Sequence, residues 1–158
     1  MAANKGRGNI STEMALVRAF RSLKIKGWRR HLHLHGRPDF AFREEKLAIF
    51  VDGCFWHGCP KHCRMPQSNI DFWRQKIGGN VLRDKKINHL LTLSGWRILR
   101  IWEHELNTDL VACARKIQRH LVATSRARSS RPDRSHVQSR SRCSVSRKHA
   151  QLPSSSRR

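Results

Sequence analysis

Acidic residues are scarce in this chain of 158 residues. Eleven aspartates and glutamates stand against 33 lysines and arginines, which gives a formal net charge of +22 at pH 7. An excess of one sign this large destabilises a compact chain through self-repulsion unless a polyanion offsets it. The shortage of acidic residues therefore makes nucleic acid the leading expected partner.

Long hydrophobic runs are absent as well. No apolar stretch approaches the roughly 18 residues of a membrane-spanning helix, and the first residues, MAANKGRGNIST, lack the apolar centre of a secretory signal. We therefore expect no membrane partner and a cytoplasmic location. Thiols stay reduced in that compartment, so the five cysteines are expected to bind metal rather than to form disulfides.

Aliphatic residues become rare from Thr124 onward, where the chain is rich in serine and arginine. Such a composition cannot bury enough apolar area to offset the entropy lost on ordering. We expect a flexible basic arm at residues 1–10, one folded domain at 11–123 and a disordered basic tail at 124–158. The tail holds ten basic residues and one acidic residue, so the rest keeps 23 against 10 and a charge of +13.

The sequence DGCFWHGCPKHC, which starts at position 52, concentrates metal-binding side chains in twelve residues. Cys54, Cys59 and His62 have the ligand types and the short loop spacing that tetrahedral zinc prefers. Cys63 is an alternative to His62, because two adjacent residues on one ion would need a cramped backbone. His104, at the end of a predicted strand, can complete the set, although a solvent-facing histidine would fit that position too.

Hydrophobic periodicity predicts a domain with the element order α-β-β-β-α-β-α. The expected helices span Ser11 or Thr12 to about Lys24, Ser68 or Asn69 to Gly95 with an interruption at Gly78 and Gly79, and Leu106 to about Val122. The expected strands span Trp28 to Leu34, 39–42, 46–51 and 96–102. This order gives an α/β domain around a mixed, mostly four-stranded sheet.

Two of these strands place an acidic residue beside the metal loop. The strands around the charged turn at 43–45 form a predicted hairpin, which brings Asp39 opposite Phe50 to Asp52. Asp39 could then hold Mg²⁺ while His57 acts as the base in the hydrolysis of a phosphodiester. The simpler alternatives are a turn carboxylate after proline for Asp39 and a spare zinc ligand for His57.

Three large aromatic residues, Phe55, Trp56 and Trp73, lie in or shortly after the metal loop. They could belong to the core. On a strongly basic protein they could instead wedge between base pairs, where stacking compensates an unstacking cost of about a few kcal/mol. Both interpretations stay open.

Four separated motifs carry a resemblance to a known family: GRPDF at 36–40, IFVDGCFWHGCPKH at 49–62, FWRQKIGGNVLRD at 72–84 and GWRILRIWEHEL at 95–106. Over residues 11–106 the chain resembles the very-short-patch mismatch repair endonucleases. The resemblance implies a restriction-endonuclease-like α/β fold, with a mixed sheet flanked by helices and a structural zinc loop. It also implies Mg²⁺-dependent nicking of double-stranded DNA, 5′ to the thymine of a T:G mismatch. We further expect a monomer associated with the bacterial nucleoid.

The resemblance assigns catalytic residues by position. Asp39 looks like the carboxylate that binds catalytic Mg²⁺, and His57 looks like the histidine that activates the attacking water. Glu13 and Asp84 look like supporting acidic residues.

The same resemblance assigns the metal loop and the aromatic residues. The family's zinc positions are occupied by Cys54, Cys59, His62 and His104, with Cys63 as the alternative to His62. The positions at which the family inserts aromatic rings beside the mismatch are occupied by Phe55, Trp56 and Trp73.

One pair of residues departs from the best-known family members, which have Thr-His before Gly-Cys-Phe-Trp. This chain has Val51 and Asp52 there. Val51 could keep a main-chain carbonyl contact to Mg²⁺, and Asp52 could supply a carboxylate in place of the missing second histidine.

Two other functional classes stay open. One is a homing or mobile-element endonuclease of the same fold that cuts intact duplex. The other is a zinc-stabilised DNA-binding module that does not cut.

Overall fold

The computed structural model describes residues 10–129. In chain order the elements are α1 (Ile10–Ser22), β1 (Trp28–Arg30), β2 (Phe40–Phe42), β3 (Leu47–Asp52), α2 (Ile70–Leu93), β4 (Arg97–Trp102), α3 (Glu103–Thr108) and α4 (Leu110–Ser129). The predicted arm, apart from Ile10, and the predicted tail beyond Ser129 lie outside the described residues.

The four strands form one mixed sheet in the order β1-β2-β3-β4. β1, β2 and β3 are antiparallel neighbours, and β4 runs parallel to β3. Phe40 pairs with Ile49 and Phe42 with Leu47, which carries Asp39 to the C-terminal end of β3. The predicted hairpin is therefore confirmed, and so is the mixed four-stranded sheet.

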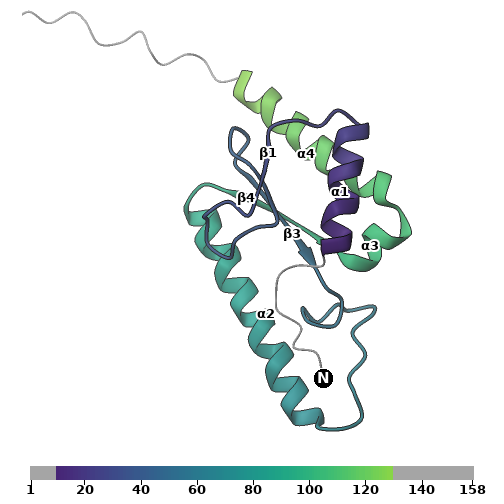
Figure 1. Ribbon diagram of the computed structural model, residues 1–158. Helices are drawn as coiled ribbons and strands as arrows, with labels where there is room; N and C mark the ends of the chain where they lie inside the picture. Colours follow the sequence, from purple (N-terminus) through teal and green to yellow (C-terminus); the bar gives the residue numbers. More distant parts are fainter. Residues whose placement is uncertain (1–9, 130–158) are drawn as a thin grey trace, which may run out of the picture.

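Helices cover both faces of this sheet (Figure 1). Because alternate residues of a strand point to opposite faces, Leu47 and Ile49 of β3 join the larger core with α1, α3 and α4, whereas Ala48 and Phe50 pack with Leu91 of α2. Asp52 follows the alternation of Ala48 and Phe50. It therefore lies on the face covered by α2.

Helix α2 is a single helix of 24 residues, so the interruption predicted at Gly78 and Gly79 is wrong. A glycine disfavours a helix by roughly 0.5–1 kcal/mol relative to alanine. That cost does not break a helix whose Ile77 and Leu91 are buried against the rest of the domain.

Two other glycines let loops approach α2 closely. Gly36 has φ 76°, and a Cβ there would lie 2.5 Å from the side chain of Ile87. Gly58 has φ 65°, and its Cβ would lie 3.3 Å from Ile77 and Val81. Both positions combine a left-handed backbone with a close neighbour, which favours glycine. Gly58 thereby holds the metal loop, and His57 with it, against α2.

The predicted closing helix is divided in two. α3 ends at Thr108, and Asp109 interrupts the helical backbone with φ −151° and ψ 89°. Its Oδ1 accepts a hydrogen bond from the main-chain N–H of Ala112 at 2.8 Å, which is the contact of a helix N-cap. α4 then continues past Val122 to Ser129, into the residues predicted to be tail.

The first two elements differ from their predicted bounds. α1 begins at Ile10, before the predicted caps Ser11 and Thr12. β1 ends at Arg30 instead of Leu34, because His31 takes a left-handed backbone with φ 49°. Between residues 10 and 129, no helix is long and apolar enough to cross a bilayer.

Candidate active site and metal-binding loop

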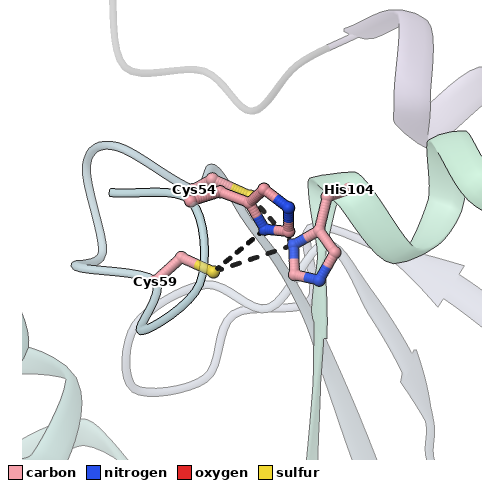
Figure 2. Close-up of side chains that lie close together, drawn as sticks. Cys54, Cys59 and His104 are labelled. Atoms are coloured by element: carbon pink, nitrogen blue, oxygen red, sulfur yellow. Dashed lines mark hydrogen bonds between the residues drawn. The ribbon is translucent and has the colours of Figure 1, made fainter. Parts of the chain in front are cut away.

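Four metal-ligating side chains come together here, three from the loop after β3 and one, His104, from the start of α3 directly after β4. Ligand atoms of Cys54, Cys59, His62 and His104 all lie within 4.8 Å of one another. The Nδ1 atom of His104 lies 3.1 Å from Sγ of Cys54 and 3.7 Å from Sγ of Cys59. Figure 2 shows the side chains of Cys54, Cys59 and His104 turned toward one another. Four ligands at zinc bond lengths stand roughly 3.3 to 3.8 Å apart at the corners of a tetrahedron. The set can hold a metal ion, and its two thiols and two imidazoles match the ligands that zinc prefers.

Cys63 does not join this set. Its Sγ lies 3.6 Å from the main-chain carbonyl of Phe55, whereas Nδ1 of His62 lies 3.8 Å from Sγ of Cys59. The geometry therefore favours His62 over Cys63 as the metal ligand.

A second group of possible ligands comes from α1, from the residue after β1 and from the residue before β2. Ligand atoms of Glu13, His31 and Asp39 lie within 4.8 Å of one another. Glu13 is 1% exposed; its Oε2 is in contact with Nη2 of Arg30 and lies 3.6 Å from Nε2 of His31. Asp39 is held by the main-chain N–H of Val51, which donates to Oδ2 at 2.7 Å. Asp39, the carboxylate predicted to bind Mg²⁺, is thus hydrogen-bonded to Val51, whose main-chain carbonyl was predicted to bind the same ion.

Burial makes the negative charge of Asp39 costly. The pKa of Asp39 is raised from 3.8 to about 6. Desolvation is the largest cause and the carboxylates of Glu13 and Asp52 add to it, while the hydrogen bond from Val51 and the His31 side chain act in the opposite direction. A bound cation would offset this cost, because an opposite charge at close range favours the ionised carboxylate. The environment of Asp39 therefore fits a cation site.

On the other side of β3, His57 meets Asp84 from α2. The Nδ1 atom of His57 lies 2.6 Å from Oδ2 of Asp84 and 3.8 Å from Oδ1 of Asp52. With Nδ1 engaged by a carboxylate, Nε2 is the nitrogen that remains to accept a proton. This is the arrangement of a histidine oriented as a base.

Asp52 is 3% exposed, and its carboxylate faces Arg100 from β4. Both of its oxygens lie 2.8 Å from Nη1 of Arg100. The Nη2 atom of the same guanidinium lies 3.3 Å from Oδ1 of Asp84. The carboxylate that departs from the family pattern is therefore neutralised by an arginine.

The three aromatic residues form one cluster at the mouth of the metal loop. The centroid of the Phe55 ring lies 5.2 Å from that of Trp56 and 5.3 Å from that of Trp73, and both pairs have edge-to-face geometry. Trp56 is 38% exposed, and neighbouring Phe72 is 57% exposed. Since exposed aromatics of this size are not needed for a core, the cluster offers stacking surface next to the site.

Two residues of the site were not predicted. His31 joins Glu13 and Asp39 because β1 pairs with β2 in a register that the sequence does not reveal, and its left-handed backbone was not expected. Arg100 was given no role in the sequence analysis. Its place on the α2 face follows from the parallel pairing of Phe50 with Arg100.

The carboxylates of Glu13 and Asp39 and the histidine-aspartate pair lie near the C-terminal end of β3, beside a partly exposed aromatic cluster on a strongly basic domain. Together with the mixed α/β fold, these features match those expected of an enzyme that acts on the phosphodiester bonds of DNA.

Comparisons with known proteins give the family. The model of the family described as DNA mismatch endonuclease Vsr matches residues 1–65. The type II nicking enzyme V.NmeDIP of Neisseria meningitidis serogroup C is 35% identical over 120 residues, which cover 75% of this chain and 80% of that protein. The chain belongs to the Vsr family of DNA mismatch endonucleases, whose fold is restriction-endonuclease-like.

Two further relatives match a shorter region. The type II nicking enzyme V.NaeI of Lentzea aerocolonigenes is 48% identical over 85 residues, 54% of this chain and 51% of that protein. DNA mismatch endonuclease Vsr of Escherichia coli K12 is 45% identical over 73 residues, 44% of this chain and 46% of that protein. The chain thus matches about half the length of these two relatives.

Proposed function

We propose that this protein nicks double-stranded DNA 5′ to the thymine of a T:G mismatch, in a reaction that depends on Mg²⁺. The observation that carries the proposal is the junction at the end of β3, where Asp39 is bonded to Val51 and His57 is bonded to Asp84 of α2. A cation site and an oriented base are the two parts that phosphodiester hydrolysis needs.

Asp39 and the main-chain carbonyl of Val51 are the groups that would hold Mg²⁺. When bound, the ion supplies stabilisation of the negative charge that develops on the phosphoryl oxygens. Glu13 would add a second negative charge near the ion, since its carboxylate lies within 4.8 Å of that of Asp39. The raised pKa of Asp39 supports this role, because a buried carboxylate without a cation is poorly stabilised.

His57 would accept the proton of the attacking water at Nε2. Asp84 holds the other ring nitrogen at 2.6 Å, which selects the tautomer with a lone pair on Nε2. The same contact stabilises the imidazolium that forms on proton transfer. Asp84 therefore positions the base and takes no proton itself.

Phe55, Trp56 and Trp73 would enter the DNA beside the mismatch. A wedge of aromatic rings costs unstacking energy that depends on how easily the base step opens. A T:G wobble step should open more cheaply than a matched step, so the wedge would favour mismatched duplex. The basic surface adds affinity that does not depend on sequence.

Zinc is the metal that we propose for Cys54, Cys59, His62 and His104. Closing this set fixes the loop between β3 and α2, which carries His57 and two of the three aromatic rings. Its role is structural, because all four tetrahedral positions are then filled by protein. We further propose that the protein acts as a monomer in the cytoplasm.

The favoured alternative within the same class is an endonuclease that cuts intact duplex. Membership of a mismatch endonuclease family argues against a module that binds without cutting. End-labelled T:G and matched T:A duplexes, each with Mg²⁺ or with EDTA, test the proposal. We expect Mg²⁺-dependent nicking of the T:G duplex at a rate at least about tenfold above the T:A duplex. Equal cleavage would favour the alternative, and no cleavage of either would refute nicking.

A further inference from the structure

Asp52 is a buried carboxylate at the edge of the proposed active site, yet its contacts are those of a residue that holds another side chain. Its two oxygens share Nη1 of Arg100, each at 2.8 Å. The charge of this carboxylate is offset by the guanidinium, which lessens its attraction for a metal ion. This indicates a role different from that of the catalytic carboxylate which Asp52 was predicted to supply in place of the missing histidine.

Arg100 is clamped on several sides. Its Nε donates to Oδ1 of Asn88 at 3.2 Å, and its Cζ lies 4.7 Å from the centre of the Phe50 ring. The planar guanidinium presents its donors in a fixed fork. Once Asp52, Asn88 and Phe50 hold the plane, the direction of the remaining Nη2 atom is set as well.

That remaining atom points at Asp84. Nη2 of Arg100 is buried and makes no hydrogen bond, but it forms an ion pair with Oδ1 of Asp84 at 3.3 Å. The other oxygen of Asp84, Oδ2, lies 2.6 Å from Nδ1 of His57. One oxygen of Asp84 therefore contacts Arg100, and the other contacts His57, the proposed base.

We propose that Arg100 is a positioning residue: held by Asp52, it orients Asp84 so that Asp84 holds the His57 ring in the reactive tautomer. This inference rests on the proposed role of His57 as base. It also explains why an aspartate can stand at the position where the best-known family members carry a second histidine. In this chain Asp52 acts through Arg100, and Asp39 serves the cation.

The test compares Arg100→Met with Arg97→Met in the full-length protein. Arg97 is a matched control on the same strand, and its Nη2 donates to the main-chain carbonyl of His120 on α4. We expect Arg100→Met to lower the single-turnover nicking rate on T:G duplex by about 10- to 100-fold, less than the loss of the base itself, with the dissociation constant for DNA changed by less than about twofold. Arg97→Met should leave the rate within about twofold.

A spectroscopic measurement makes the result independent of cleavage. Long-range ¹H–¹⁵N correlation of the imidazole rings should show His57 as the single Nδ1-H tautomer in the wild type and as a tautomer mixture in Arg100→Met. Arg100→Lys serves if the methionine variant does not fold, since lysine keeps a charge near Asp52 but lacks the fork that reaches Asp84. It should show the same tautomer change.

Asp52→Asn combined with Arg100→Met completes the design. If Asp52 acts through Arg100, the double variant should nick no more slowly than Arg100→Met alone. An unchanged nicking rate and an unchanged His57 tautomer in a folded Arg100 variant would overturn the inference. A wild-type protein that nicks no DNA would instead refute the proposed function, while the tautomer measurement would still decide the role of Arg100.

Discussion

The Nδ1 atom of His57 lies 2.6 Å from Oδ2 of Asp84, a residue 27 positions further along the chain. The metal loop presents His57, and the middle of α2 presents Asp84. Gly58 makes the meeting possible, because a Cβ there would press on Ile77 and Val81 of α2. The contact between His57 and Asp84 therefore depends on how the metal loop packs against α2.

Asp84→Asn should lower the nicking rate by about 10- to 100-fold, because the amide can present its NH₂ group to the ring and stabilise the wrong tautomer. DNA affinity should stay within about twofold, as measured by fluorescence anisotropy at one fixed salt concentration. Asp71→Asn is the control, since Asp71 lies in the first turn of the same helix with a side chain 99% exposed. Equal activity of the two variants would contradict the role of Asp84.

Removal of the buried charge at Asp39 should change how stability depends on pH. Burial raises the pKa of Asp39 from 3.8 to about 6, so the folded protein binds this proton more tightly than the unfolded chain does. The group's stabilising contribution is therefore complete below about pH 4 and is lost as the pH rises to about 6. The expected loss is roughly 2 to 3 kcal/mol.

Urea unfolding at pH 4, 5, 6 and 7 without Mg²⁺ measures this effect. Asp39→Asn should gain stability relative to the wild type across that window, by the amount that the wild type loses. Asp71→Asn again serves as the exposed control. A constant difference between wild type and Asp39→Asn over the whole range would show that Asp39 is not desolvated as described.

Cys59→Ser should release the metal and destabilise the loop, because the binding free energy of a structural metal is also folding free energy. The melting temperature should fall by about 10 °C or more, and the zinc content should fall from about one per chain towards zero. Cys63→Ser should keep both values, since Cys63 contacts a carbonyl instead of the ligand set. Loss of zinc in the Cys63 variant, or a full complement in the Cys59 variant, would require a different ligand set.

Trp56→Ala should reduce the preference for mismatched DNA. Stacking of a base on an aromatic ring is worth roughly 1–3 kcal/mol, so the ratio of T:G to T:A nicking rates should fall by about 5- to 100-fold. Leu93→Ala is the control, because Leu93 is 72% exposed at the far end of α2. An unchanged ratio in the Trp56 variant would place mismatch discrimination outside the aromatic cluster.

Local patterns predicted the parts of this molecule that depend on neighbouring residues. The hairpin that carries Asp39 to the end of β3 was predictable from two β-rich runs around a charged turn. The convergence of Cys54, Cys59 and His62 was predictable because the spacing within one loop limits which side chains can meet.

Other features depend on register between distant segments, for which a single sequence carries no local signal. Arg100 reaches Asp52 only because β3 and β4 pair in parallel with Phe50 opposite Arg100. His31 lies beside Asp39 because β1 pairs with β2 with Arg30 opposite Phe40. The continuity of α2 through Gly78 and Gly79 was missed for a related reason, since packing of distant residues outweighs a weak local preference.

The most direct test maps the position of the nick on an end-labelled T:G duplex under single-turnover conditions with Mg²⁺, for the wild type and for Asp39→Ala. We expect the wild type to break one strand at the phosphodiester 5′ to the mismatched thymine. The Asp39→Ala protein should bind the same duplex with similar affinity and leave it intact. Cleavage at other positions, cleavage of both strands, or near-normal nicking by Asp39→Ala would contradict the proposed function.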